Sequence, residues 1–538
     1  FISNLSGKLS LFGMYYGSSI PEPLLPPDIA MQNPDLVGGM SFRVMPKLNK
    51  ILLMLDNNGD ENYQPMYLPI DGGFPEPAFG GYFSNHRVHL VECDQEKNIV
   101  YFLAERRDKP IQEAYRGDLA GDKVEKLAES EWGAQPLCPS EDHSRLMIAD
   151  GYAAGDDVLW MLENGKKTLL LGKPIEDRKK GESVALTGLR GVEWTPSGEN
   201  LIVITATSED TYSLGLVELT QPGIVQPIQL VGRQHTGLGE MTKLKHLRGT
   251  HYLVEYNIDG CSWAYEGVYN ELKRVMDLRY VLVGEGDLAN GKIETLDYDK
   301  EGDRFALSFS TAVSPTQIYT LENKDRETIV MHTEERILGI PESHLSKGED
   351  ASFTSHDGMR ISARLYMPAD DLGYQGPRPL VYYIHGGPQS QERPDFAWFS
   401  MPLIQYLTLR GFAVFVPNVR GSSGYGLNYM KQVDRDWGGL DRLDHVHAMT
   451  KFLPKDKRLD VKRAAVVGRS YGGYMTLTLA GRHPELWAAA CDMFGPYDLI
   501  TFCERIPETW KPYFKVIMGD PNIPEDKAFM VDRSPKTY

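Results

Sequence analysis

The sequence lacks long apolar runs, paired cysteines and an excess of positive charge. No stretch reaches the roughly 18–20 apolar residues of a membrane-spanning helix, and no charged-then-apolar leader opens the chain, which favours a cytoplasmic location. The formal net charge of −17 argues against nucleic acid or membrane as a main partner, because a phosphate-binding surface needs an excess of Lys and Arg. The cysteines lack the short paired spacings of a zinc site or a disulfide framework, so we expect inert thiols at Cys93, Cys138, Cys261, Cys491 and Cys503.

What is present is the composition of an ordinary globular protein, with 41% hydrophobic and 24% charged residues and no long polar tract. The chain has 538 residues, and single hydrophobic cores stop growing near roughly 250–300 residues. We therefore expect two domains, each large enough to fold without disulfides or metals. The chain opens on Phe1 rather than Met, so a leader could precede it.

Residues 1–340 are expected to form an all-β domain, because short β-rich runs alternate there with Gly, Asn and Asp turns. Runs of this kind recur at a spacing of roughly fifty residues, which is the period of four-stranded propeller blades. With an incomplete first blade at residues 1–30, we predict a propeller of seven blades, and six or eight stay open because weakly similar repeats are easily miscounted. The recurring runs are NKILLMLDNNGD, KNIVYFLAERRD, SRLMIADGYAAGDD, ENLIVITATSED, THYLVEYNIDG and DRFALSFSTA.

Residues 341–538 are expected to form an α/β domain, because strands alternate there with helical stretches. PLVYYIHGG, AVFVPNVRG and AAVVGRS read as strands, and MPLIQYLTLRGF, LDRLDHVHAMTKFL and YGGYMTLTLAGRHPELW read as helices. This alternation is typical of a mostly parallel sheet with helices on both faces.

Gly468, Ser470 and Gly472 form the pattern G-x-S-x-G, which is weak evidence by its letters alone. Its context is stronger, because it follows an apolar strand and leads straight into a helix, as a nucleophile elbow does. The sharp turn strains the serine backbone and needs small neighbours. We predict that Ser470 is a nucleophile and that the N–H of Tyr471 stabilises an oxyanion. The alternative is a tight turn with a capping serine.

The HGGP stretch, residues 385–388, ends an earlier strand of the same domain. Glycines there let a main-chain N–H face the site and complete the oxyanion hole. Gly387 is the expected donor, and Gly386 is the alternative. His385 precedes the serine and stands where oxyanion architecture is expected, so we do not expect it to be the base.

Three motifs follow the propeller region in order: HGGP, NVRGSSGYG (residues 418–426) and GRSYGGYM. Together they resemble the prolyl oligopeptidase family of serine peptidases, and the residues after the serine are most similar to its acylaminoacyl-peptidase and dipeptidyl-peptidase branches. The resemblance implies that the propeller covers the site and admits short peptides, and it implies no metal and no cofactor. It also implies that Arg420 and Tyr425 support the site rather than act as acid or base.

The partners of Ser470 are harder to find, because in an α/β-hydrolase the acid and then the histidine follow the serine. The only later histidine is His483. It lies about thirteen residues along the helix, nearly 20 Å from the hydroxyl, whereas proton transfer needs roughly 3 Å. We expect it to end the helix. His445 and His447 point to different faces of one helix and make a poor metal pair.

Asp492 and Asp498 come too early for the acid, and we take them as structural or substrate-side residues. The resemblance implies that a segment like DRSPKTY precedes the strands that carry the Asp and the His. We therefore expect a sequence cut at both ends, with a hydrolase domain truncated at its C-terminus and inactive as it stands.

The prediction is a serine peptidase that hydrolyses short peptides through an acyl-enzyme on Ser470. An esterase or amidase of the same fold stays open, as does a non-catalytic propeller scaffold with a degenerate hydrolase domain. A dipeptidyl peptidase would need propeller acids to bind a free amine. Glu334 and Glu335 are adjacent, but they lie near the domain junction and are expected to be solvated. The sequence does not decide between exopeptidase and endopeptidase action. It does not decide the oligomeric state either, and a homo-oligomer stays open.

Overall fold

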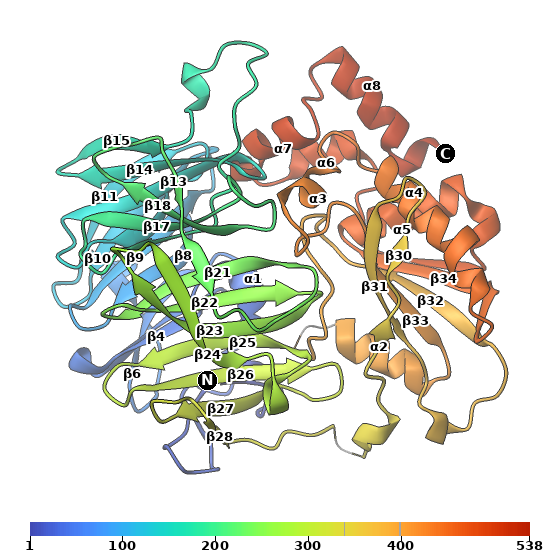
Figure 1. Cartoon of the computed structure of the whole chain (residues 1–538), viewed down its shortest axis with the longest axis horizontal. Coiled ribbons are helices and arrows are strands. Elements are labelled where there is room, and N and C mark those ends of the chain that lie inside the picture. Colours follow the sequence, from blue (N-terminus) through green and yellow to red (C-terminus); the bar gives the residue numbers. More distant parts are fainter. Residues whose placement is uncertain (338, 398–399) are drawn as a thin grey trace.

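The computed structural model describes residues 1–337, 339–397 and 400–538. Figure 1 shows a β-propeller, coloured blue to yellow-green, beside an α/β domain coloured orange to red. The described residues of the propeller form seven sheets, so the expected seven blades are confirmed. Within the described ranges, no helix is long and apolar enough to cross a membrane.

Each blade is built from strands that follow one another along the chain. The first two blades contain β1 (Ile2–Ser3), β2 (Ser10–Gly13) and β3 (Glu22–Pro23), then β4 (Phe42–Met45), β5 (Lys50–Leu55), β6 (Gln64–Pro69) and β7 (Glu76–Pro77). The third and fourth contain β8 (His86–Asp94), β9 (Ile99–Arg106), β10 (Gln112–Asp118) and β11 (Lys123–Ser130), then β12 (Gln135–Pro139), β13 (Arg145–Ala153), β14 (Asp156–Glu163) and β15 (Lys166–Leu171). The fifth contains β16 (Gly191–Trp194), β17 (Asn200–Thr205), β18 (Ser213–Glu218) and β19 (Gln226–Pro227).

The sixth blade has a fifth strand, because β20 pairs in parallel with β24. It contains β20 (Gln229–Val231), β21 (Gly239–Arg248), β22 (His251–Ile258), β23 (Cys261–Asn270) and β24 (Val275–Val283). The seventh contains β25 (Gly291–Asp299), β26 (Arg304–Thr311), β27 (Gln317–Glu322) and β28 (Thr328–Met331). The short helix α1 (Pro34–Val37) lies between the first two blades in sequence.

The recurring apolar runs of the sequence are β5, β9, β13, β17, β22 and β26, which are the second strands of their blades, except that β22 is the third strand of the sixth blade because β20 precedes β21. Five of these strands are buried along most of their length, and β26 is buried along half of it; in β17 every residue after Asn200 is buried. A strand covered on both faces carries a continuous apolar run rather than an alternating one. Because each blade packs between two others, these strands carry apolar runs, and the repeat can therefore be recognised in the sequence.

The α/β domain is built on one sheet in the order β29-β31-β33-β32-β34-β35, with β30 paired to β31. The strands β32 to β35 run parallel, and β31 joins them antiparallel, so the expected mostly parallel sheet is confirmed. The strands are β29 (Glu349–Asp350), β30 (Phe353–Thr354), β31 (Arg360–Tyr366), β32 (Arg378–Ile384), β33 (Ala413–Asn418), β34 (Leu459–Arg469) and β35 (Ala489–Met493).

Helices cover both faces of this sheet (Figure 1). On one face Ile404 of α2 belongs to the same core as Val414 of β33, and on the other Met475 of α5 packs with Val466 of β34. The helix α4 ends at His447 and continues as a π-helical turn, Ala448–Phe452. The helices are α2 (Ser400–Leu409), α3 (Leu427–Lys431), α4 (Leu440–His447), α5 (Tyr471–Arg482), α6 (Leu499–Arg505), α7 (Lys511–Ile517) and α8 (Pro524–Arg533).

The last propeller strand ends at Met331 and the first strand of the α/β domain begins at Glu349. The domain boundary that we propose, after residue 340, falls between them. The two domains also touch far from this junction. The helix α7 contacts β13, and Thr509 donates a hydrogen bond of 2.8 Å to Glu105 of the propeller.

Candidate active site

Ser470 stands at a sharp turn between β34 and α5. Its φ of 55° and ψ of −119° are unusual for a residue with a side chain, and its N–H donates to the carbonyl of Met493 at 3.0 Å. The side chain is exposed, and within the described residues its hydroxyl has no hydrogen-bond partner. This is the geometry of a nucleophile elbow, which presents the serine at the N-terminus of a helix.

Small residues are required on both sides of Ser470. A Cβ on Gly468 would lie 2.2 Å from the carbonyl oxygen of Gly472, and a Cβ on Gly472 would lie 2.1 Å from that of Ile384. Real Cβ atoms do not approach backbone so closely. The glycines of the motif are therefore needed for the close approach of β34, α5 and the end of β32.

The oxyanion loop, residues 385–397, starts where β32 ends at Ile384. A Cβ placed on Gly386 would be 4.0 Å from the hydroxyl oxygen of Ser470, so this glycine borders the serine. Gly387 follows in the left-handed region, with φ of 123°. Both predicted donors thus belong to the segment beside the serine, and which N–H faces an oxyanion stays a prediction.

Tyr471 is the first residue of α5, so its N–H has no acceptor within the helix. Its side chain turns away from solvent and is buried, with its ring 4.9 Å from that of Trp437. The phenol donates a hydrogen bond to Asp441, a buried carboxylate at the start of α4. Burial raises the pKa of Asp441 to about 6. The N–H of Tyr471 is therefore free of a helical acceptor, while its side chain is held in the core by Asp441.

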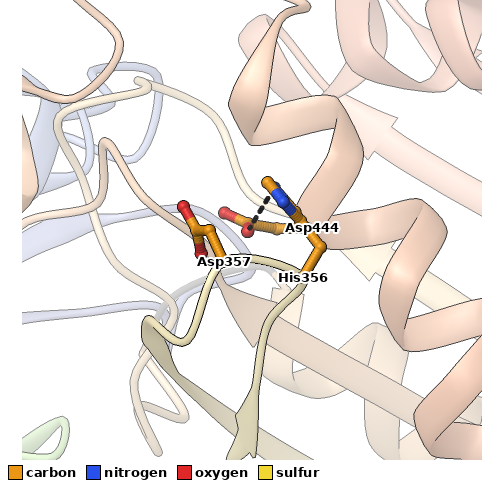
Figure 2. Close-up of side chains that lie close together, drawn as sticks. All are labelled: His356, Asp357 and Asp444. Atoms are coloured by element: carbon orange, nitrogen blue, oxygen red, sulfur yellow. Dashed lines mark ion pairs between the residues drawn. The ribbon is translucent and has the colours of Figure 1, made fainter.

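Arg420 is buried and makes a two-pronged ion pair with Asp444, with both N···O distances 2.7 Å. It also donates to Asp357 at 2.8 Å, and this hydrogen bond lowers the pKa of Asp357 to about 2. Figure 2 shows Asp357 and Asp444 close to His356, whose ring nitrogen lies 3.9 Å from Asp444. These three side chains could surround a cation by distance alone. Arg420 already neutralises both carboxylates, which argues for a structural cluster.

Tyr425 lies in the support loop, residues 418–427, which runs from the last residue of β33 to the first residue of α3. Its hydroxyl accepts hydrogen bonds from Gln391 at 2.7 Å and from Asn418 at 3.1 Å. Gln391 belongs to the oxyanion loop. Tyr425 thus joins the two loops, which agrees with the supporting role that we propose for it.

The histidines of the α/β domain make other contacts. His385 is buried, with one ring nitrogen 2.9 Å from the hydroxyl of Ser422, and burial lowers its pKa to about 4. His445 is buried against the hydroxyl of Tyr382 at 3.0 Å. His483 caps the C-terminal end of α5, as expected from its place before Pro484. None of these three bonds to Ser470 in the described parts of the chain.

Asp492, in β35, and Asp498, which follows that strand, hold local structure. Asp492 accepts from the N–H of Gly495 at 2.8 Å, and Asp498 caps α6 by accepting from the N–H of Ile500 at 3.1 Å. Sequence reasoning missed Asp441 and Gln391, which hold Tyr471 and Tyr425. Neither carries a motif, and each meets its partner only after folding.

Comparison with known proteins supports this assignment of the fold. The profile of the Prolyl oligopeptidase family matches residues 397–537. The chain is 28% identical over 264 residues to dipeptidyl aminopeptidase BIII of Pseudoxanthomonas mexicana, covering 47% of this chain and 36% of that protein. It is 32% identical over 274 residues to the acylamino-acid-releasing enzyme of Mus musculus, covering 48% and 35%.

A solved structure described as puromycin hydrolase superposes on the whole chain with a TM-score of 0.75 at 19% identity, covering 99% of this chain and 80% of that one. At this identity the likeness shows a shared two-domain fold. The chain spans about a third of the length of the curated relatives that it matches, 36% for the first and 35% for the second. The chain contains a domain of the prolyl oligopeptidase family.

Proposed function

We propose that this protein is a serine peptidase that hydrolyses short peptides, with Ser470 as its nucleophile. The observation that carries the proposal is the backbone of Ser470, held at φ 55° with its hydroxyl exposed and unpartnered in the described structure, beside Gly386. A capping serine would use its hydroxyl to accept from the helix N-terminus, and Ser470 makes no such bond. Strain of this kind is kept where a side chain must be presented.

In the proposed reaction the Ser470 oxygen attacks the scissile carbonyl carbon, and its proton passes to a base. The N–H groups of Tyr471 and of Gly387, or Gly386 in its place, hold the negative oxygen of the tetrahedral intermediate. The intermediate collapses to an ester on Ser470 as the amine leaves with a proton. Water then attacks the ester, which releases the acid and restores the serine.

The base and the acid that orients it are proposed to be a His and an Asp, and none of the three histidines described above takes the role of the base. His385 and His445 are buried with other partners, and His483 stands at the far end of α5. The lack of a bond between Ser470 and any of these three histidines also supports the rival proposal, a non-catalytic scaffold.

The proposed substrate class rests on the propeller beside the site and on the names of the relatives. These include a dipeptidyl aminopeptidase and an acylamino-acid-releasing enzyme, which name two kinds of exopeptidase. Glu334 and Glu335 are exposed, and Glu334 pairs with Arg336, so this pair does not support binding of a free amine at the site. A cytoplasmic location stays a proposal, supported by the free state of all five cysteines.

The test uses the full-length natural protein and a fluorophosphonate, which phosphonylates activated serines. Labelling that maps to Ser470 and vanishes in Ser470→Ala, but not in the exposed control Ser208→Ala, supports the proposal. Faster turnover of peptide p-nitroanilides than of p-nitrophenyl esters, relative to their uncatalysed rates, separates a peptidase from an esterase. A folded full-length protein that takes no label favours the scaffold.

A further inference from the structure

The oxyanion loop and the support loop are bound to each other by main-chain and side-chain hydrogen bonds. Besides the bond between Gln391 and Tyr425, the N–H of Ser423 donates to the carbonyl of Ser390 at 2.8 Å. Asn418 accepts from the N–H of Glu392 at 2.9 Å and donates to its carbonyl at 3.2 Å. A displacement of the support loop must therefore disturb the loop that carries Gly386 and Gly387.

The support loop is in turn held by a carboxylate of the propeller. Glu240, at the start of β21, accepts from the N–H of Gly424 at 2.9 Å with one oxygen and from the N–H of Gly426 at 3.0 Å with the other. The side chain is buried, with 2% of its residue surface exposed. Its charge is balanced by Arg190, which lies 2.5 Å away and stacks over Tyr212. Buried hydrogen bonds to a charged group are among the stronger ones in proteins.

The loop is shaped for this contact. Gly424 and Gly426 have φ of 99° and 102°, in the region that favours glycine. A Cβ on Gly426 would lie 2.3 Å from a carboxylate oxygen of Asp210, a second propeller acid, which accepts from the N–H of Asn428 at 2.9 Å. The glycines let the backbone approach the propeller closely enough to donate to its acids.

The oxyanion loop also touches the propeller directly. Asn257 donates to Gln391 at 2.5 Å, and the half-buried guanidinium of Arg393 donates to the carbonyl of Gly260 at 2.7 Å. These contacts come from the β22–β23 hairpin of the blade that contains Glu240. One blade thus holds both loops of the candidate site.

We propose that Glu240 is a positioning residue for the candidate active site: by holding Gly424 and Gly426 from the propeller, it fixes the support loop and, through Tyr425 and Gln391, the oxyanion loop. The inference rests on the proposed function for its catalytic consequence. The oxyanion hole then forms only when the propeller is packed against the α/β domain. The carboxylate that orders the two loops belongs to the propeller, whereas the loops belong to the α/β domain.

The test replaces Glu240 in the full-length protein and follows two readouts. Glu240→Gln keeps the shape of the side chain but removes one acceptor and the charge. The first readout is hydrogen exchange of the peptide covering residues 386–397, and the second is the rate of Ser470 phosphonylation by a fluorophosphonate at saturating and at low probe concentration. The matched control is Glu105→Gln, which removes an interdomain acceptor at Thr509 and touches neither loop.

We expect Glu240→Gln to speed exchange at residues 386–397 by about tenfold, with the rest of the α/β domain unchanged. The saturating labelling rate falls by a similar factor while the half-saturating probe concentration stays within about twofold, because binding of the probe is kept and its activation is lost. Tyr425→Phe, which removes the link to Gln391 and leaves Glu240 in place, produces the same local change. Glu105→Gln behaves as wild type.

Unchanged exchange at residues 386–397 in Glu240→Gln overturns the inference, as does a uniform rise across both domains or an equal effect of Glu105→Gln. If the wild-type protein takes no label at Ser470, the proposed function fails, and exchange alone decides the inference. A local rise then supports the holding role of Glu240, and no rise overturns it.

Discussion

The phenol of Tyr471 donates a hydrogen bond to the carboxylate of Asp441 directly beneath the elbow. Asp441 is buried and also accepts from the N–H of Gly438 at 3.1 Å and of Arg442 at 2.7 Å. The residue proposed to supply one oxyanion donor is therefore anchored by a buried acid on a neighbouring helix. This arrangement makes the elbow sensitive to the ionisation of that acid.

Asp441→Asn is expected to change how stability depends on pH. Burial raises the pKa of Asp441 to about 6, so the folded wild type holds this proton over a range where the unfolded chain, with an ordinary carboxyl, has lost it. The contribution of Asp441 to folding stability is therefore greatest below about pH 4 and is lost as the pH rises through about 6. The stability of Asp441→Asn relative to wild type should rise by on the order of 2 kcal/mol between pH 4 and pH 7.

Thermal unfolding midpoints of the two proteins across this pH range measure the difference. The exposed Asp371→Asn serves as control and should track the wild type at every pH. A difference between Asp441→Asn and wild type that stays flat from pH 4 to pH 7 would contradict the prediction.

Ser470→Gly is expected to be more stable than Ser470→Ala by about 1–2 kcal/mol, because glycine relieves the positive φ while alanine keeps the Cβ that is strained there. Urea unfolding followed by far-UV circular dichroism measures both variants. At the exposed Ser208, which lies outside the left-handed region, the same pair should show no advantage for glycine. Equal stability of the two Ser470 variants would mean that the turn is unstrained.

Gly472→Ala is expected to destabilise the α/β domain by more than about 3 kcal/mol, because the new Cβ would meet the backbone of Ile384 at 2.1 Å. Gly13→Ala is the control, since a Cβ there has its nearest contact at 3.6 Å and should change stability by less than about 1 kcal/mol. The midpoints of urea unfolding compare the two. Similar small losses in both variants would show that the elbow can open to accept a side chain.

How much the sequence could predict depended on distance along the chain. The elbow lies within one continuous stretch, where β34, Ser470 and α5 follow each other, so its geometry was accessible from a motif and its flanks. The second strands of the blades were equally accessible, because burial on both faces leaves a local apolar run.

The contacts that hold the site were not accessible in this way. Asp441 meets Tyr471 across 30 residues, and Glu240 meets Gly424 across 184. No periodicity or spacing marks such pairs, since they depend on how two helices or two domains pack. The sequence does not show whether an acidic residue is buried or exposed, and only the fold distinguishes the two.

Arg420→Met is expected to cost about 3–5 kcal/mol, because it leaves Asp444, which is 0% exposed, as an unpaired buried charge. The control is Arg458→Met, which breaks ion pairs with Asp456 and Glu349 at a side chain that is 51% exposed and should cost about 1 kcal/mol or less. The double variant Arg420→Met with Asp444→Leu should recover part of the loss, since the unpaired charge is then gone. Urea unfolding midpoints rank the stabilities of Arg420→Met, Arg458→Met and the double variant. If Arg420→Met costs no more than Arg458→Met, solvent must reach Asp444, and the ion pair does not support the loop that carries Arg420.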